Sequence, residues 1–215
     1  MTARGRRHAK AVSHLQASDP VMAGIIDRVG PCRLGEPRPG EAAAPDHYGA
    51  LLRSIVGQQL SVAAARSIYG RLVARYGGRT PTPKDLLADD PAELQAAAGL
   101  SRAKVASLRD LAERIERGEL HLERLDDLEA DDVAAELIQV KGVGPWTVDM
   151  FLIFHLGRPD VLAVGDLGLR RAAMIEYGLR KLPSPERFTR LARPWRPWRS
   201  VASWYLWASL NVAPQ

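Results

Sequence analysis

Apolar residues recur at intervals of three and four along almost the whole of this 215-residue chain. Between residues 46 and 58, this spacing places on one helical face Tyr48, Leu51, Leu52, Ile55 and Val56. No stretch shows the sustained two-residue alternation of a half-buried strand, and only residues 161–164 would make a credible short strand. The sequence therefore predicts an all-α fold.

Capping residues and glycines mark where the predicted helices begin and end. Ser61, Asp90 and Ser101 are placed to cap helices, and Gly99 and Gly118 are placed to end them. Together with the apolar spacing, these signals predict helices over residues 46–58, 62–76, 91–98, 102–117, 130–140, 145–156, 166–177, 185–192 and 197–212. The pattern is compatible with one domain or with two lobes.

The N-terminal region differs from this helical body. Residues 1–18 are predicted to be a basic flexible tail, or alternatively an arm that contacts phosphates; their cationic residues are Arg4, Arg6, Arg7 and Lys10. Residues 19–45 form an N-terminal extension, of which residues 30–45 are rich in glycine and proline and are predicted to be a loop. The body is expected to occupy residues 46–215.

Composition and charge restrict the function classes. A formal net charge of +5 favours an anionic partner such as nucleic acid. The single cysteine, Cys32, excludes a four-cysteine zinc or iron–sulfur site and favours a reduced, cytoplasmic environment. The five histidines lack metal-ligand spacing, and no GxxxxGK[ST] phosphate loop occurs. No signal-peptide core and no apolar run of about 20 residues is present, so no membrane partner is expected.

Residues 137–148, LIQVKGVGPWTV, contain a glycine-rich break between two predicted helices. Gly142 and Gly144 permit a tight turn, and Pro145 suits the first position of the following helix. The N–H groups at the start of that helix can bind an anion such as a DNA phosphate, and Lys141 adds positive charge. A plain αα-corner, in which the glycines only permit the turn, is the alternative.

The segment from residue 137 to 147 resembles the helix-hairpin-helix of base-excision-repair DNA glycosylases. Asp166 follows Gly144 by 22 residues, at the spacing of the obligatory aspartate of that superfamily. Two further stretches are similar to its alkylation-repair branch, 3-methyladenine DNA glycosylase II: IVGQQLS from residue 55, and WRPWRS from residue 195 followed by WYLW. The resemblance runs from about residue 46 to 212. It implies two helical lobes that flank an active-site cleft, without the N-terminal β domain of longer relatives.

The resemblance assigns Asp166 as the catalytic carboxylate. In this family, the aspartate stabilises the oxocarbenium-like charge that develops on the deoxyribose as the glycosidic bond breaks. By its position alone, Asp166 would be a helix N-cap, and the two roles are compatible. Bifunctional relatives carry a lysine nucleophile at the position of Trp146. Tryptophan cannot form a Schiff base, so the resemblance implies a monofunctional enzyme in which water is the nucleophile.

The resemblance also implies which residues contact the flipped base. The base pocket is expected to contain Trp146, Trp207, Met150 and Leu167. Met150 and Leu167 stand where the best-known family member carries tyrosine, which leaves the substrate range open. A place in the core of a helix face is the alternative for Trp207, as it is for Trp204 and Tyr205.

The residues expected to contact DNA come from the hairpin and from the loop after the first helix of the resemblance: Gln58, Gln59, Leu60, Lys141, Gly142, Val143, Gly144 and Thr147. A side chain must fill the gap that a flipped base leaves in the stack. Gln59 is the first candidate for this plug and Leu60 the second. Alternatively, the two glutamines cap neighbouring backbone groups.

These observations predict a monofunctional DNA glycosylase of base excision repair that hydrolytically releases alkylated purines of the 3-methyladenine and 7-methylguanine type. Its expected partner is double-stranded DNA that contains damaged bases, and a cytoplasmic, nucleoid-associated monomer is expected. No cofactor or catalytic metal is expected, although the hairpin of this superfamily can hold a monovalent cation when DNA is bound. The alternatives are another damaged or mismatched base as substrate, and a non-catalytic DNA-binding module.

Overall fold

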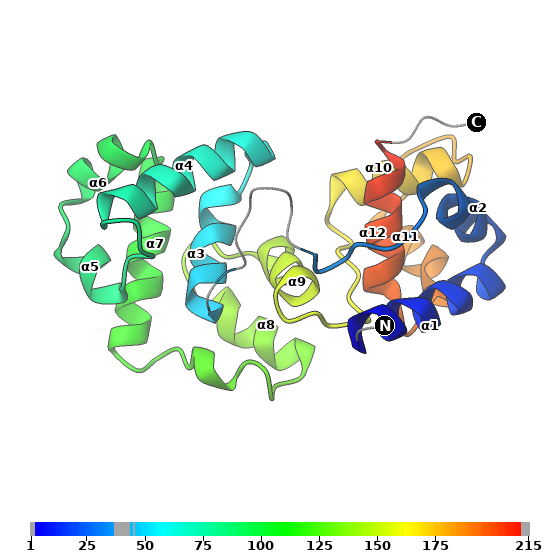
Figure 1. The fold of residues 1–215 in the computed structure, drawn as a ribbon, viewed down its shortest axis with the longest axis horizontal. Helices are drawn as coiled ribbons and strands as arrows, with labels where there is room; N and C mark the ends of the chain where they lie inside the picture. The colour runs from blue at the N-terminus through cyan, green and yellow to red at the C-terminus, as the bar shows by residue number, and fades with distance from the viewer. Residues whose placement is uncertain (1–2, 37–43, 45, 212–215) are drawn as a thin grey trace. The chain divides into compact units, whose positions relative to one another are not determined.

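All regular structure in the described part of the chain is helical (Figure 1). The computed structural model describes residues 3–36, 44 and 46–211. Its α-helices are α1 (Ala3–Ser18), α2 (Pro20–Val29), α3 (His47–Gly57), α4 (Val62–Arg75), α5 (Pro83–Ala88), α6 (Pro91–Ala98), α7 (Arg102–Glu116), α8 (Ala130–Ile138), α9 (Pro145–Phe154), α10 (Leu167–Glu176), α11 (Pro185–Leu191) and α12 (Arg199–Ser209). Two short 3-10 helices are η1 (Leu122–Arg124) and η2 (Arg193–Trp195). The predicted all-α class is confirmed.

The chain folds into two compact units, as the two-lobe prediction requires. Unit 1 consists of Met1–Glu36 and Leu152–Gln215, and unit 2 consists of Pro37–Phe151. The boundary falls within α9. Unit 1 therefore joins the two ends of the chain, whereas unit 2 is formed by one continuous segment.

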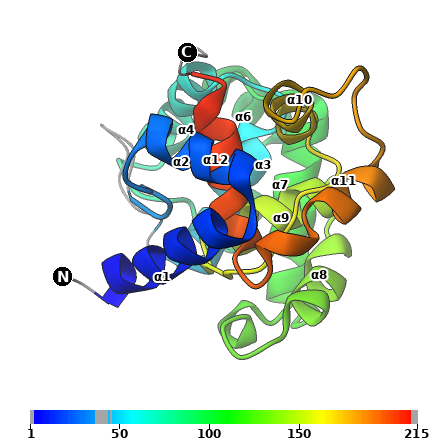
Figure 2. The same cartoon turned by 90° about the vertical axis from the view of Figure 1, so that its right-hand side faces the viewer.

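Helix α12 is the central element of unit 1, and α1, α2 and α10 pack against it (Figures 1 and 2). Its buried face includes Val201, Tyr205 and Leu206. Apolar side chains of α1 and α2 also contribute to this core, among them Leu15 and Met22, which are completely buried. Burial of these side chains supplies the main favourable term for the unit.

The buried carboxylate of Asp19 connects the elements of unit 1. Its Oδ1 caps α2 by accepting hydrogen bonds from two backbone N–H groups in the first turn of that helix. Its Oδ2 accepts hydrogen bonds from the hydroxyl of Tyr177, at 2.6 Å, and from the indole of Trp195, at 2.8 Å. Because Tyr177 ends α10 and Trp195 lies in η2, one carboxylate joins the N-terminal segment to the C-terminal half of the unit.

Helix α7 has the corresponding role in unit 2, where α3, α5 and α6 pack against it. Its inner face includes Leu108 and Leu111, both completely buried. Arg109 of α7 donates hydrogen bonds to the carbonyls of Leu86 and Asp89 at the end of α5, at 2.8 and 3.0 Å. Because α7 packs against both α5 and α3, it can support the loop that follows α3 and the loop that follows α8.

The predictions for the N-terminal region need correction. Residues 3–18 form helix α1 rather than a flexible tail, because Ala11 and Leu15 are buried against the other helices of unit 1. Residues 20–29 form α2, so the extension is an integral part of unit 1. Positions 37–43 and 45 of the predicted loop lie outside the described residues, as do the side chains of the first seven residues and the predicted helix end at Val212.

The buried segment at residues 161–164 is not a strand. The N–H of Val161 bonds to the hydroxyl of Ser200, and the N–H of Val164 bonds to the carbonyl of Leu162, so the segment turns instead of pairing. Helix α5 was not predicted, since its six residues are too short to show a period. No helix in the described ranges combines the length and apolar character needed to cross a membrane.

Candidate active site and nucleic-acid interface

Asp166 lies at the N-cap of α10 in unit 1. Its Oδ1 accepts one hydrogen bond from the backbone N–H of Leu169, at 2.7 Å, and another from the indole N–H of Trp207, at 3.1 Å. The N-cap expected from the sequence is therefore confirmed. The additional donor comes from α12 and fixes the orientation of the half-buried carboxylate more tightly than a cap alone would.

The first turn of α12 holds the loop that leads to α10. The hydroxyl of Ser200 accepts the N–H of Val161 at 3.0 Å. Arg199 forms a bidentate ion pair with Asp160, with Nε 2.6 Å from Oδ1 and Nη2 3.1 Å from Oδ2. Trp207 follows Ser200 by seven residues, about two turns along the same face of the helix. A single rigid helix thus positions both the loop and the indole that bonds to the carboxylate.

Two residues that the sequence did not identify complete this part of the site. The ring of Phe154, which is 40% exposed, lies 5.5 Å from that of Trp207, with 31° between their planes. Gly168 leaves room for the indole, since a Cβ at this position would lie 3.0 Å from Oδ1 of Asp166 and 3.7 Å from the ring of Trp207. The result is an aromatic pair beside a fixed carboxylate, a combination suited to stabilising positive charge.

The predicted base-pocket residues are divided between the two units. Leu167 and Trp207 belong to unit 1, and Leu167, with 66% of its surface exposed, directly follows the carboxylate in sequence. Trp146 and Met150 belong to unit 2, one turn apart on α9, and Trp146 is 39% exposed. The alternative of a core position is correct for Tyr205, which is completely buried.

The predicted hairpin is present in unit 2 between α8 and α9, and it packs against α7. Gly142 has a φ of +77°, and a Cβ at this position would collide with Oγ of Ser107 on α7. Asp110, one turn further along α7, accepts the N–H of Lys141 at 2.8 Å. Glycine is required here both for the left-handed backbone and for the close approach to α7.

The backbone of the hairpin presents unused hydrogen-bond donors. The buried side chains of Val140 and Val143 anchor the turn, while Lys141 is exposed. No hydrogen bond among the described residues uses the N–H of Gly142 or of Gly144. Free N–H groups at the start of a helix form an anion site, so this geometry agrees with the proposed phosphate grip.

The loop after α3 carries the predicted plug. Gln59 is exposed and has a φ of +57°, which is uncommon for a residue with a side chain. Leu60 is 37% exposed. Gln58 instead turns toward the hairpin, where its Nε2 donates to the carbonyl of Gly142 and to Oγ1 of Thr147, both at 2.9 Å.

The structure gives Gln58 and Thr147 a role that differs from the predicted contact with DNA. Thr147 is 3% exposed, its hydroxyl accepts the amide of Gln58, and its N–H bonds to the carbonyl of Gly144. Thr147 thus exposes little surface to a partner, and its contact with DNA stays a prediction. These two side chains therefore connect the loop after α3 to the hairpin, and a contact of Gln58 with DNA stays a prediction.

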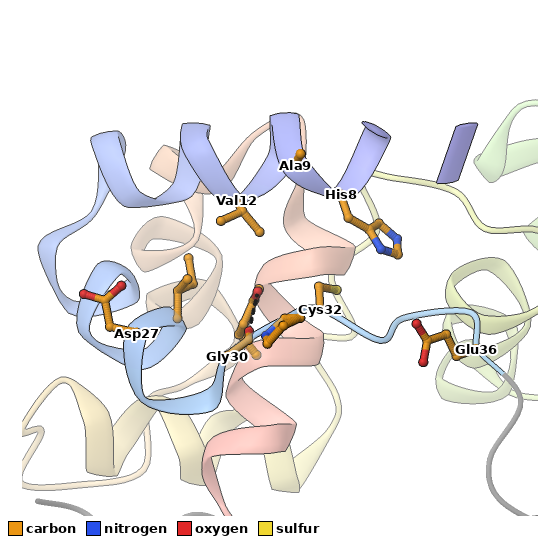
Figure 3. Close-up of a pocket in the computed structure, with 10 residues that line it drawn as sticks. His8, Ala9, Val12, Asp27, Gly30, Cys32 and Glu36 are labelled. Carbon is orange, nitrogen blue, oxygen red and sulfur yellow. Dashed lines mark hydrogen bonds between the residues drawn. The ribbon is translucent and has the colours of Figure 1, made fainter. Parts of the chain in front are cut away.

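A cavity of about 540 Å³ in unit 1 lies away from these residues (Figure 3). It is formed by α1, the end of α2 and α12, and its walls include Cys32, Asp27 and Tyr205. Burial raises the pKa of the Cys32 thiol to about 11, so this sulfur is protonated and weakly nucleophilic at neutral pH. Asp166 does not line the cavity.

Of the site residues that were not predicted, one has a recognisable signal in the sequence. Phe154 follows Met150 by four residues and Trp146 by eight, so the four-residue spacing of large side chains is a signal that points to it. Gly168, two residues after Asp166, carried no signal of its own. Lys104 on α7, which donates to backbone carbonyls at the end of α3, also gave none.

Comparisons with known proteins find matches along most of the chain. The family model described as HhH-GPD superfamily base excision DNA repair protein matches residues 52–197. DNA-3-methyladenine glycosylase 1 of Schizosaccharomyces pombe is 33% identical over 206 residues, which cover 95% of this chain and 88% of that protein. DNA-3-methyladenine glycosylase 2 of Escherichia coli is 29% identical over 212 residues, which cover 93% and 70%. The solved structure of the S. pombe enzyme Mag1 in complex with abasic DNA matches with a TM-score of 0.85 and 32% identity, over 95% of this chain and 98% of that one.

Proposed function

The chain belongs to the HhH-GPD superfamily of base excision DNA repair proteins, and we propose that it is a monofunctional DNA glycosylase that releases alkylated purines of the 3-methyladenine type. The observation that carries this proposal is the carboxylate of Asp166, which two N–H donors hold at the start of α10. Relatives that cover nearly the whole chain are named 3-methyladenine glycosylases, which supports the same activity.

In the proposed reaction, the bond between C1′ of the deoxyribose and the purine nitrogen breaks, and its electron pair leaves with the base. Positive charge develops on C1′ and the ring oxygen, and the Asp166 carboxylate stabilises it electrostatically. Water then adds to C1′ and loses a proton, for which the same carboxylate is a suitable acceptor. An alkylated purine is already cationic, so its departure as a neutral base needs no general acid.

Water is the proposed nucleophile because Trp146 stands where bifunctional relatives carry a lysine. An indole cannot attack C1′ to form the Schiff base that leads to strand cleavage. The product should therefore be an abasic site in an intact strand. The alternative, a lyase reaction, would require an amine that the residues near Asp166 in unit 1 do not supply.

The side chains proposed to contact the flipped base favour a cationic purine. Phe154 and Trp207 form an aromatic pair beside Asp166, and a cation is attracted to such rings. Trp146, Met150 and Phe154 recur every four residues and thus lie along one side of α9. Leu167 is also proposed to contact the base, on the basis of its exposure and its place next to the carboxylate.

Duplex DNA is the proposed partner, bound through phosphates by the N–H groups of Gly142 and Gly144 and by Lys141. Gln59 is the proposed plug, because it is exposed at the tip of its loop. Charge supports an anionic partner as well: residues 170–199 contain nine Lys or Arg residues and two glutamates, a net charge of +7 where the whole chain carries +5.

Base release from methylated duplex DNA tests the proposal, with wild type compared to Asp166→Asn and Asp132→Asn at one salt concentration. Asparagine keeps the oxygen that accepts the two hydrogen bonds, so Asp166→Asn should fold and bind DNA while its rate of release falls at least a hundredfold. Asp132, an exposed carboxylate of α8, is the control and should be unaffected. Release of 3-methyladenine with no strand cleavage supports the mechanism.

Two outcomes would contradict the proposal. DNA binding without release of any base, by wild type as by Asp166→Asn, would indicate a non-catalytic module. Release of a mismatched or oxidised base but not of an alkylated purine would contradict the proposed substrate, while the proposed catalytic role of Asp166 would stand. A lesion panel measured with the same three proteins separates these results.

A further inference from the structure

Lys104, in the first turn of α7, turns its ammonium group inward rather than toward solvent. Its Nζ donates to the carbonyl of Val56 at 2.7 Å and to the carbonyl of Gln58 at 3.0 Å. Burial lowers the pKa of this lysine. A lysine that has given up part of its hydration to bond two backbone carbonyls is not placed as an outward phosphate contact.

The two carbonyls belong to the C-terminus of α3, which ends at Gly57. Carbonyls at a helix C-terminus lack partners within the helix and carry the negative end of the helix dipole. A cation at this place therefore stabilises the last turn and fixes the direction in which the chain leaves α3. That direction determines where the following loop projects.

The other side of the same loop is held by the hairpin. The backbone carbonyl of Gln58 accepts a hydrogen bond from Lys104. Its side-chain amide donates to the carbonyl of Gly142 and to the hydroxyl of Thr147, both at 2.9 Å. Gln58 is thus bound from two elements at once. The residue that precedes the plug cannot shift without breaking bonds to α7 or to the hairpin.

Gln59 needs this support because of its backbone. Its φ of +57° is in the left-handed region, and it is the non-glycine residue with a positive φ in the described part of the chain. That conformation is unfavourable for a residue with a Cβ, which crowds the backbone there. The flanking bonds hold the backbone in this state and leave the exposed side chain of Gln59 at the tip of the loop.

We propose that Lys104 is a positioning residue that, through Gln58, holds Gln59 in the conformation needed to occupy the gap left by a flipped base. The inference rests on the proposed function, since it presumes that the protein opens damaged duplexes. It assigns different roles to two elements: the hairpin binds phosphates, and Lys104 of α7 fixes the position of the plug relative to the hairpin.

Binding to two duplexes tests this inference. One duplex is intact, and the other contains a single tetrahydrofuran abasic site, so only the second has a gap to fill while the phosphates are the same. Fluorescence anisotropy at constant salt gives both affinities. Lys104→Met should lower the preference for the abasic duplex about tenfold and change affinity for the intact duplex less than twofold. Lys104→Arg, which keeps a donor, should recover part of the preference.

A double-mutant cycle assigns the effect to Gln59. Gln59→Ala should lower the same preference, and Lys104→Met should add no further loss when Gln59 is already alanine. Lys84→Met, at an exposed lysine of α5, is the matched control and should behave as wild type. If Lys104→Met does not fold by circular dichroism, Gln58→Leu breaks the bonds of the loop to the hairpin and should produce the same loss of preference.

Several outcomes would overturn the inference. Equal losses of affinity for both duplexes would make Lys104 a general DNA contact, and additive losses in the cycle would place its effect away from Gln59. If the wild-type protein showed no preference for the abasic duplex, the proposed role of Gln59 as a plug would be wrong. Absence of base release in the glycosylase assay, together with an intact preference, would contradict only the proposed function.

Discussion

At the scale of single residues, Asp166 combines the observed role of a helix N-cap with the catalytic role proposed for it. Its Oδ1 caps α10 through the N–H of Leu169 and also accepts the indole of Trp207. Hydrogen bonds to an ionised group are worth about 2 kcal/mol each. A carboxylate held by a backbone donor and by a second helix has little freedom to rotate away from a developing positive charge.

The substitution Trp207→Phe should remove the indole bond and retain an aromatic ring against Phe154. Loss of about 2 kcal/mol of positioning corresponds to a fall in kcat of about thirtyfold. Affinity for undamaged DNA should stay within twofold. Single-turnover base release checks this, with Trp204→Phe on the same helix as the control. An equal loss in the control would mean that any change in α12 disturbs the site.

At the scale of elements, unit 1 depends on contacts that reach across the sequence. Asp19, which is 6% exposed, caps α2 and accepts hydrogen bonds from Tyr177 and Trp195. Arg28 of α2 adds an ion pair with Glu176 of α10 at 2.6 Å. The N-terminal helices are therefore part of the framework that holds α10, the helix capped by Asp166.

Replacing Asp19 with alanine should leave four donors unpaired, two of them in the first turn of α2. Buried unsatisfied groups cost about 1–3 kcal/mol each, and partial relaxation leaves a net loss of about 3 kcal/mol. For a chain of this size, the melting temperature should fall by about 10 °C. Calorimetry on Asp19→Ala and on Asp27→Ala, an exposed carboxylate of α2, tests this. A similar shift in both variants would contradict the connecting role of Asp19.

The hairpin should be sensitive to an added methyl group. Gly142→Ala would place a Cβ at positive φ and against Oγ of Ser107, and should weaken DNA binding about tenfold. Adding Ser107→Ala should relieve the collision and recover part of the affinity, because the backbone strain remains. Anisotropy on the two single variants and the double variant measures this; no recovery would mean that α7 does not limit the hairpin.

At the scale of the whole molecule, positive charge is distributed unevenly along the chain. Between residues 170 and 199, six exposed cations have no ion-pair partner among the described residues: Arg171, Arg180, Lys181, Arg187, Arg190 and Arg193. In unit 2, Arg75, Arg79, Arg114 and Arg117 are each paired with a carboxylate, whereas Lys84 and Arg124 are exposed and form no ion pair with the described residues. Unpaired cations are the ones available to phosphates.

Neutralising two of these cations, in the variant Arg187→Gln with Arg193→Gln, should weaken binding to any duplex without changing preference for a lesion. If each contacts one phosphate, the slope of log affinity against log salt should decrease by about 2. The control carries the same charge change in unit 2, at the exposed residues Lys84 and Arg124. An identical slope in variant and control would exclude this stretch as a phosphate contact.

The sequence predicted those features that neighbouring residues decide. Ser61, Asp90, Ser101 and Asp166 all cap helices as expected, because a cap is a bond between a side chain and a backbone group two or three residues away. The prediction of a tail over α1 was wrong because its buried apolar residues, Ala11 and Leu15 among the described side chains, lie between many basic and polar ones. These two apolar residues become part of a core because α2 and α12 pack against α1.

By itself, the sequence determined the helical class, the hairpin and the spacing from Gly144 to Asp166, since each depends on short-range geometry or on a motif. Tertiary structure alone decided that Trp207 bonds to the carboxylate, that Gln58 bonds to Thr147, and that Lys104 bonds to carbonyls at the end of α3. The partners in these contacts are separated by 41 to 89 residues. Which of many polar side chains meet over such separations is set by the packing of whole helices, and no local pattern encodes it.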